Sequence, residues 1–378
     1  METNLLIVGA GPFGLAAGAQ ASFLGIDHVI LGKPMGFWRD HMPKGMYLRS
    51  ACDWHLDPQD KSTISEYLRL LGKSPNDVEP LSLEFYLSYV EWFMNENSIR
   101  PLPHFVRSLN YNERAKTFSA LTQNGEILAS RVVVAPGFEH FAFVPPELKS
   151  LLPAHSFSHT CNFVDFKAVS GKRFLIIGGR QSAFEWAALL HEAGAKAIHL
   201  CHRHESPRFE PSDWTWVNPL VDQIFENPGW YRALPEPEQE VLKQRLWAEG
   251  RLKVEPWLEP RLKTANLFVC SNTQVVETIK RESDLLVTLT NGESIEVDHV
   301  ILATGYKVEI DNLPILASGN ISQKLETRNG FPVLDDHFQT SVPGLFITSM
   351  PATQDFGPFF GFTIAVRASA KLICAACQ

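Results

Sequence analysis

The chain lacks several features that mark other classes of protein. Its 378 residues contain no apolar run long enough for a transmembrane helix, and its net charge of −8 argues against a nucleic-acid partner. No basic segment precedes the first apolar run, so we expect no signal peptide. The length suits two domains, or one large domain with an insertion. We therefore expect a cytoplasmic protein that does not bind a membrane.

Cysteine is also scarce, with six residues and no framework spacing, which suits a reducing compartment. Cys374 and Cys377 form a C-x-x-C pattern that closes an apolar, helix-like segment. For this pair we favour helix packing over redox chemistry. No metal-ligand cluster, Ser-His-Asp arrangement or paired carboxylates stand out. We therefore expect no metal site, and we expect a cofactor to supply the chemistry.

What is present first is a strand, a glycine turn and a helix at the N-terminus. Leu5–Gly14 reads LLIVGAGPFG, so that Gly9, Gly11 and Gly14 have G-x-G-x-x-G spacing ahead of an Ala-rich helix. Gly9 permits the turn, Gly11 lets the backbone approach a pyrophosphate, and Gly14 lets the helix pack close to the strand. The helix N-terminus then favours phosphate binding.

The next strand ends without the acidic residue that usually holds the ribose in such a site. Gly32 and Lys33 stand there instead, which weakens the case for NAD in this site and makes Lys33 a candidate phosphate contact. The irregular stretch 35–50 that follows is either a loop on the core or part of a ligand site. Its candidates for packing on a flat ligand are Trp38, Met46 and Leu48, and its candidates for meeting charge are Arg39 and Arg49.

A second strand, glycine turn and helix occurs near mid-chain, in Lys172–Ala183. Gly178 and Ala183 hold the outer positions of the turn, but Arg180 replaces the middle glycine. Arg180 either supplies a guanidinium to a phosphate or crowds the pyrophosphate. Arg203 lies just beyond the following strand, where an arginine accommodates a 2′-phosphate and favours NADP over NAD, unless it is only a solvated strand end.

Two later stretches change in composition. Residues 205–262 are rich in Trp, Pro and Glu and contain one long helix, Glu236–Gly250, so they predict an inserted helical cap that shapes a pocket or forms a dimer surface. Phe356–Phe362 reads FGPFFGF and leads into a terminal helix. It either brings backbone N–H groups to a ring system or is a simple helix entry.

Three motifs together resemble a known family. GAGPFG at Gly9–Gly14, GGRQSA at Gly178–Ala183 and D-x-x-x-L-A-T-G-Y at Asp298–Tyr306 are similar to those of flavin-containing and N-hydroxylating monooxygenases, which have two dinucleotide-binding domains. The resemblance implies an α/β fold in which an NAD(P)H-binding Rossmann-like domain and a helical cap are inserted into an FAD-binding Rossmann-like domain. The expected division is 1–165 and 300–378 for FAD, and 166–299 for NAD(P)H with a helical insertion at about 205–262.

The residue patterns and the resemblance together give the expected cofactor residues. Those expected at FAD or NADPH are Gly9, Gly11, Pro12, Phe13, Gly14, Lys33, Trp38, Arg39, Met46, Leu48, Gly178, Gly179, Arg180, Gln181, Ser182, Arg203, Thr304, Gly305, Tyr306 and Phe359. The candidates for substrate or proton handling are Arg49, His55 and Asp355.

The function implied is that of an NADPH-dependent FAD monooxygenase, in which a C4a-hydroperoxyflavin transfers one oxygen atom of O₂ to a small organic substrate. Two alternatives stay open. One is a flavoprotein reductase or oxidase of the disulfide-reductase type, and the other is an FAD protein that does not use NAD(P)H because Arg180 blocks the second turn. The substrate, the choice between NADPH and NADH, and whether the chain forms a homodimer also stay open.

Overall fold

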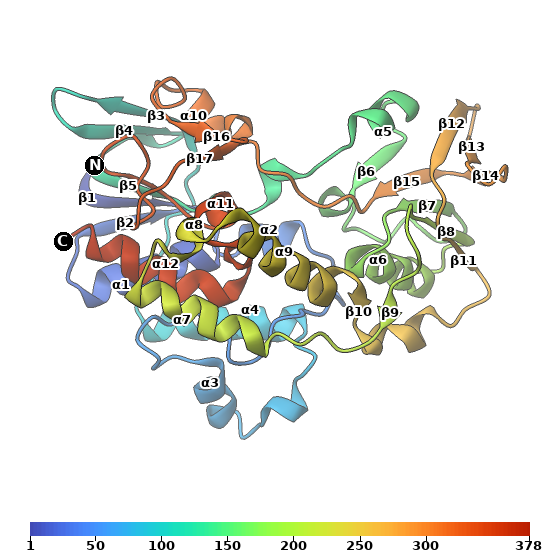
Figure 1. The fold of residues 1–378 in the computed structure, drawn as a ribbon, viewed down its shortest axis with the longest axis horizontal. Helices are drawn as coiled ribbons and strands as arrows, with labels where there is room; N and C mark the ends of the chain where they lie inside the picture. Colours follow the sequence, from blue (N-terminus) through green and yellow to red (C-terminus); the bar gives the residue numbers. More distant parts are fainter.

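The computed structural model describes residues 1–378, which form two α/β lobes side by side, with both chain termini at the outer end of the first lobe (Figure 1). The first lobe contains a six-stranded sheet of order β2-β1-β5-β4-β3, with β18 paired to β5. Its strands are β1 (Glu2–Val8), β2 (His28–Leu31), β3 (Val106–Asn112), β4 (Thr117–Thr122), β5 (Gly125–Val134) and β18 (Leu345–Ile347).

Apolar residues explain this first sheet. Strand β1 is paired in parallel with β2 and β5, and Leu5, Leu6 and Ile7 are fully buried at its centre. Helix α1 (Pro12–Phe23) packs between β1 and the C-terminal helix α12 (Val366–Ala375), and ten consecutive residues of α1 are buried. The glycine turn between β1 and α1 is therefore held in place by the largest hydrophobic cluster of the protein.

The second lobe contains an all-parallel, five-stranded sheet of order β11-β8-β7-β15-β6. Its strands are β6 (Phe157–His159), β7 (Arg173–Ile177), β8 (Ala197–Cys201), β11 (Leu267–Cys270) and β15 (His299–Leu302). Helix α6 (Gln181–Glu192) follows β7 as α1 follows β1. Strands β6 and β15 extend the second sheet beyond the expected range 166–299 at both ends. Strand β6 carries no glycine turn, and β15 runs into the turn at Gly305, which does not say which of the two sheets the strand joins.

The inserted segment lies between β9 (Arg208–Phe209) and β10 (Lys253–Val254), which form a two-stranded parallel sheet. It contains the helices α7 (Asn218–Glu226), α8 (Trp230–Ala233) and α9 (Glu236–Arg251). Although it emerges from the second lobe, it runs back across the first, where α7 contacts α12 and α8 contacts α11 (Thr353–Phe356) (Figure 1). The segment therefore links the two lobes.

The remaining elements connect these parts. A third sheet of order β12-β13-β14 turns at Asn291-Gly292, and β4 and β5 turn at Asn124-Gly125, as Asn-Gly hairpins predict. No helix of the structure is long and apolar enough to cross a membrane. The other strands are β12 (Val275–Lys280), β13 (Leu285–Leu289), β14 (Ser294–Val297), β16 (Thr327–Arg328) and β17 (Phe331–Pro332), and the other helices are α2 (Gly36–Asp40), α3 (Ile64–Leu70), α4 (Leu83–Glu96), α5 (Pro146–Leu151) and α10 (Pro314–Ala317).

Candidate active site

The first glycine turn is shaped by close backbone contacts. Gly9 has φ of +114°, and a Cβ atom there would lie 2.2 Å from the carbonyl oxygen of Ala135 at the end of β5. A Cβ atom on Gly14 would lie 1.8 Å from the carbonyl oxygen of Gly9, so this glycine lets α1 pack against the turn. A Cβ atom on Gly11 would meet nothing within 4 Å. The middle glycine therefore faces open space, where a ligand can approach the backbone.

That open space is a cavity of about 420 Å³ beside the first turn. Six of the predicted FAD residues line it: Gly9, Gly11, Pro12, Phe13, Lys33 and Trp38. The lining also includes Asp40 and His41 of the irregular stretch 35–50 and Gly361 and Phe362 of the segment 356–362, both of which were candidates for a ligand site. Residues that were not predicted also line it, among them His104, Pro136–His140, Ser349 and Thr363. The signal for Pro136–His140 was the Ala-Pro-Gly turn after β5, and the signal for Thr363 was the Gly-Phe-Thr entry to the terminal helix.

The other residues predicted for FAD do not line this cavity. Gly14 lies beneath it, and Arg39 donates to a carboxylate oxygen of Glu91 at 2.7 Å. Met46 packs against the hydrophobic cluster of the second lobe, and Leu48 is buried in that of the first. Phe359 is fully buried and stacks on Trp230, with ring centroids 6.4 Å apart. The side chains of Met46, Leu48 and Phe359 therefore pack in the core instead of contacting a ligand in this cavity.

The second glycine turn repeats the geometry of the first at its outer edge. A Cβ atom on Gly178 would lie 2.4 Å from the carbonyl oxygen of Ala303, at the end of β15. Arg180 is the N-cap residue immediately before α6, in extended conformation, and no side chain caps this helix. The N–H of Ala183 donates to the carbonyl oxygen of Arg180 at 2.8 Å, so the N–H groups of Gln181 and Ser182 are the ones available to an anion, together with the positive end of the helix dipole.

A cavity of about 310 Å³ lies beside this second turn. The predicted residues that line it are Gly178, Gly179, Arg180, Ser182, Arg203, Thr304, Gly305 and Tyr306. Gln181 is not among the lining residues, because its side-chain oxygen accepts a hydrogen bond from the backbone N–H of Glu255 at 3.0 Å. Arg251, at the end of α9, also lines the cavity and was not predicted.

Positive charge dominates the second cavity. Burial, reinforced by the neighbouring Arg251 and Arg203, lowers the pKa of Arg180 from its usual value to about 10. The Nη1 atom of Arg180 is buried without a hydrogen-bond partner. His202, which is 3% exposed, also lines the cavity, and its Nε2 atom has no partner. The orphaned Arg180 donor fits a cavity that receives an anionic ligand. Nε2 of His202 is an unused acceptor, because burial lowers the pKa of this ring and its Nδ1 donates to the carbonyl oxygen of His204 at 2.8 Å.

The two cavities meet at an aromatic junction. Phe37 and Phe138 line the first cavity, Tyr306 lines the second, and the ring centroid of Tyr306 lies 6.3 Å and 5.2 Å from those of Phe37 and Phe138. His41 of the first cavity donates from Nδ1 to the carbonyl oxygen of Cys161 at 2.8 Å. Burial raises the pKa of Tyr306, so its hydroxyl stays protonated. Ligands in the two cavities would thus approach each other across these rings.

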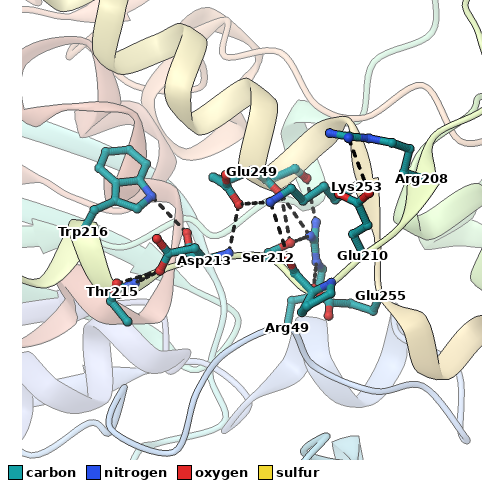
Figure 2. Close-up of polar contacts among 12 residues, drawn as sticks. Arg49, Arg208, Glu210, Ser212, Asp213, Thr215, Trp216, Glu249, Lys253 and Glu255 are labelled. Atoms are coloured by element: carbon teal, nitrogen blue, oxygen red, sulfur yellow. Dashed lines mark hydrogen bonds and ion pairs between the residues drawn. The ribbon is translucent and has the colours of Figure 1, made fainter.

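Arg49 is held by the inserted segment rather than by either cavity (Figure 2). Its Nε donates to Glu255 at 2.9 Å and its Nη1 donates to the carbonyl oxygen of Gly250 at 2.6 Å, while Nη2 contacts Ser212. The guanidinium thereby caps the C-terminal end of α9. Its contacts join the loop after α2 to the insertion.

His55 and Asp355 also lie outside both cavities. Burial lowers the pKa of His55 to about 4, helped by the charge of Arg367, so its ring is neutral at physiological pH although Asp60 lies 3.3 Å away. Asp355 accepts hydrogen bonds from Arg328 at 2.7 Å and from the backbone N–H of Leu334 at 2.9 Å. The structure does not bring Arg49, His55 and Asp355 together, and their suggested roles in substrate or proton handling stay predictions.

None of the six cysteines lines the first cavity, although Cys201 lines the second and the backbone carbonyl of Cys161 accepts the hydrogen bond from His41. Cys374 is fully buried in α12, and its thiol contacts the carbonyl oxygen of Ala17 in α1 at 3.5 Å. Burial raises the pKa of Cys374 well above its ordinary value and that of Cys377 to about 11. Both therefore stay protonated thiols within the core. No group of three or more His, Cys, Asp or Glu side chains is arranged to hold a metal ion.

Two parallel sheets, each with an uncapped helix after a glycine turn and a cavity beside it, define a protein with two dinucleotide-binding units. Sequence models for pyridine nucleotide-disulphide oxidoreductases match residues 6–229 and 240–348. The chain belongs to the pyridine nucleotide-disulphide oxidoreductase family. This agrees with the predicted fold class and with the predicted class of enzyme, an oxidoreductase.

Individual relatives narrow the comparison. The chain is 27% identical over 381 residues to the probable indole-3-pyruvate monooxygenase YUCCA8 of Arabidopsis thaliana, covering 90% of this chain and 82% of that protein. It is 32% identical over 229 residues to the FAD-dependent urate hydroxylase of Xanthomonas campestris, covering 57% of this chain and 46% of that protein. An ornithine N-hydroxylase structure from Kutzneria sp. 744 has a TM-score of 0.79 at 15% identity, covering 100% and 99% of the two chains, which confirms the fold.

Proposed function

We infer that this chain is an FAD-dependent monooxygenase that takes electrons from NADPH and transfers one oxygen atom of O₂ to a small organic substrate. The observation that carries this choice within the family is the first cavity, which no cysteine lines. A disulfide reductase of this family type would need a redox-active thiol pair near the flavin. The names of two relatives, a probable monooxygenase and an FAD-dependent hydroxylase, support the same choice.

The first cavity fits FAD through its backbone. Gly11 presents an open face at the uncapped N-terminus of α1, where a pyrophosphate would accept backbone N–H hydrogen bonds. Lys33 forms an ion pair with Asp40 at 2.6 Å, so Asp40 supplies a carboxylate near the position where a ribose-binding acid is usual. Trp38 and Phe37 both provide aromatic surface to the cavity, and Phe37 belongs to the junction. When bound, FAD would supply hydride acceptance and activation of O₂.

The second cavity fits NADPH through its charge. Arg203 follows β8 at the position where an arginine accommodates a 2′-phosphate. Because the aromatic junction separates the cavities by a few side chains, a nicotinamide ring in the second could face a flavin ring in the first. The wall of Phe37, Phe138 and Tyr306 would exclude water from the reacting groups. In this assignment residues 166–299 serve NADPH together with β6, β15 and Thr304–Tyr306, and the rest of 1–165 and 300–378 serves FAD.

The test is the colour of the purified protein and its response to NADPH. We expect a yellow protein whose flavin absorption is bleached by NADPH without air and restored by air, with peroxide released when no substrate is present. A long-wavelength thiolate–flavin band on anaerobic reduction would favour the disulfide-reductase alternative. A flavin that NADPH does not reduce would favour an FAD protein that makes no use of NAD(P)H.

A further inference from the structure

The inserted helix α9 reaches the nucleotide cavity of the second lobe. Arg251, in its last turn, lines that cavity, and Trp247 lies one turn earlier on the same helix. The guanidinium carbon of Arg180 lies 3.7 Å from the ring centroid of Trp247. Arg180 belongs to the glycine turn, so the insertion contacts the turn through one residue and its cavity through another.

Three guanidinium groups share this cavity without partners of opposite charge. Arg180, Arg203 and Arg251 all line it, and none of them forms an ion pair. Glu147 is the one acidic residue of the lining. Each guanidinium needs an acceptor for its N–H groups, and a ligand with two separate phosphate groups would supply acceptors for all three. The arrangement is thus unbalanced until an anion enters.

The stack on Trp247 determines which part of Arg180 remains free. A guanidinium that lies flat on an indole ring keeps its N–H edge available for hydrogen bonds in the plane. One edge atom, Nη1, is buried and unpartnered. The contact with Trp247 therefore holds the Arg180 side chain in one orientation over the turn. It leaves N–H donors of the guanidinium without a hydrogen-bond partner.

Building on the proposed function, we propose that α9 completes the NADPH site. Arg251 joins Arg203 on the 2′-phosphate, and Trp247 orients Arg180 so that its free edge meets the pyrophosphate. Trp247 is a positioning residue in this scheme and does not touch the nucleotide. The insertion, rather than the Rossmann-like unit alone, then determines the preference for NADPH over NADH.

The first experiment separates the 2′-phosphate from the rest of the nucleotide. Full-length Arg251→Gln protein is titrated by calorimetry with 2′,5′-ADP and with 5′-AMP. Losing one charge-assisted contact should weaken 2′,5′-ADP by about 10-fold or more and 5′-AMP by less than about 2-fold. Arg245→Gln is the matched control, because Arg245 lies on the same helix but stacks on Trp216, 4.4 Å from its ring centroid. It should bind both ligands as the parent does.

An unchanged affinity of Arg251→Gln for 2′,5′-ADP, or an equal loss for both ligands, overturns the assignment of Arg251. Thermal melting of each variant shows whether it is folded. If Arg251→Gln does not fold, two other variants take its place. Arg203→Gln is titrated with the same two ligands, and the preference for NADPH over NADH is measured for Trp247→Ala. The proposal then requires that Trp247→Ala lowers the affinity for NADP⁺.

The second experiment tests the positioning role of Trp247. Arg180→Gly should weaken NADP⁺ binding by about 10-fold, as expected for loss of a charge-assisted contact. Trp247→Ala should weaken it less, the double variant should be no worse than Arg180→Gly, and Trp247→Phe should restore most of the affinity. NADP⁺ should also change the fluorescence of the parent but produce a smaller change in Trp247→Phe. Tighter binding by Arg180→Gly, or additive losses in the double variant, contradicts the proposal.

These measurements keep the two proposals separable, because binding is read without turnover. If the protein binds 2′,5′-ADP through Arg251 but oxygenates no substrate, the role of α9 in nucleotide binding stands and the monooxygenase function is wrong. If NADPH reduces the flavin but Arg251→Gln leaves nucleotide binding unchanged, the proposed function stands and the role of α9 is wrong.

Discussion

The two glycine turns share a backbone plan and differ in the residues that meet a ligand. In both, the first glycine lies against the carbonyl oxygen of a neighbouring strand end, at Ala135 for the first turn and Ala303 for the second. At the middle position the first turn has Gly11 and the second has Arg180, and at the third position Ala183 takes the place of a glycine. From this difference we infer that strand packing requires glycine at the first position of each turn, whereas the ligand determines the residue at the middle position.

The lobes around the turns differ in the same direction. The cavity of the first turn is walled by aromatic and small residues, and its lysine is paired with an aspartate. The cavity of the second turn holds three unpaired arginines and borrows one of them from the insertion. A flat apolar ring system suits the first, and a more highly charged nucleotide suits the second. Substitutions at equivalent positions test this contrast.

The largest effect is expected from Gly14→Ala. The new Cβ atom would lie 1.8 Å from the carbonyl oxygen of Gly9, and because that atom is backbone, α1 or the turn must move. We expect a loss of about 2–4 kcal/mol in the free energy of unfolding and protein that purifies without flavin. Chemical denaturation and the flavin absorption spectrum measure the two effects.

The control for this substitution is the reverse change at the equivalent position of the second turn. Ala183 is fully buried, so Ala183→Gly removes one methyl group and adds a helical glycine, at a cost of about 1–2 kcal/mol, and flavin is retained. A Gly14→Ala protein as stable and as yellow as the parent would show that the close approach at the first turn is not required.

A smaller and more selective effect is expected from Gly11→Ala. Its Cβ atom meets no protein atom within 4 Å, and its φ of −83° suits alanine, so the stability of the flavin-free protein should be unchanged. The methyl group would instead occupy the face on which we place the pyrophosphate, and FAD affinity should fall by about 10-fold or more. Flavin titration of the stripped protein measures this. A variant with parental FAD affinity would place the pyrophosphate elsewhere.

Local signals explain how much of this arrangement the sequence predicted. Each glycine turn lies in one short stretch between an apolar strand and a helix, so both turns and eight of the residues beside the second cavity were found from sequence. Arg49 depends on contacts with a segment about 200 residues away in the chain, and Arg251 joins Arg180 and Arg203 only through the folding of the insertion; no local pattern reports such contacts. Arg49 looked like a loop arginine near a ligand, whereas the fold places its guanidinium on the end of α9. Phe359 was likewise predicted at a cofactor and lies in the core. An aromatic residue near a helix entry suits a ring contact and core packing equally well.

The helices that follow the two turns give the third test, because only α6 carries a buried carboxyl group. Burial raises the pKa of Glu185 to about 8, although the backbone N–H of Tyr47 donates to it at 2.9 Å. Between pH of about 5 and about 8 the unfolded chain loses this proton while the folded chain keeps it, so the free energy of unfolding falls as the pH rises.

Glu185→Gln should remove this pH dependence. Relative to the parent, the variant should gain about 1–3 kcal/mol in unfolding free energy on going from pH of about 5 to about 8. Denaturation at the two pH values measures it, and the comparison is insensitive to any constant cost of the substitution. Glu192→Gln on the exposed end of α6 is the control and should follow the parent. Parallel curves for the parent and Glu185→Gln would mean that the carboxyl group is already ionised when buried.

The smallest effect is expected behind the first turn, where α12 packs on α1. If Cys374 and Cys377 serve packing alone, the double alanine variant should lose about 1–2 kcal/mol of stability from the small cavities it creates, and its rate of NADPH oxidation should stay within about 2-fold of the parent. Stopped-flow reduction of the flavin measures the rate. A loss of flavin reduction or of turnover far beyond this range would give the C-x-x-C pair a part in electron transfer. The first lobe would then supply the reductive chemistry that we assign to the nicotinamide nucleotide of the second.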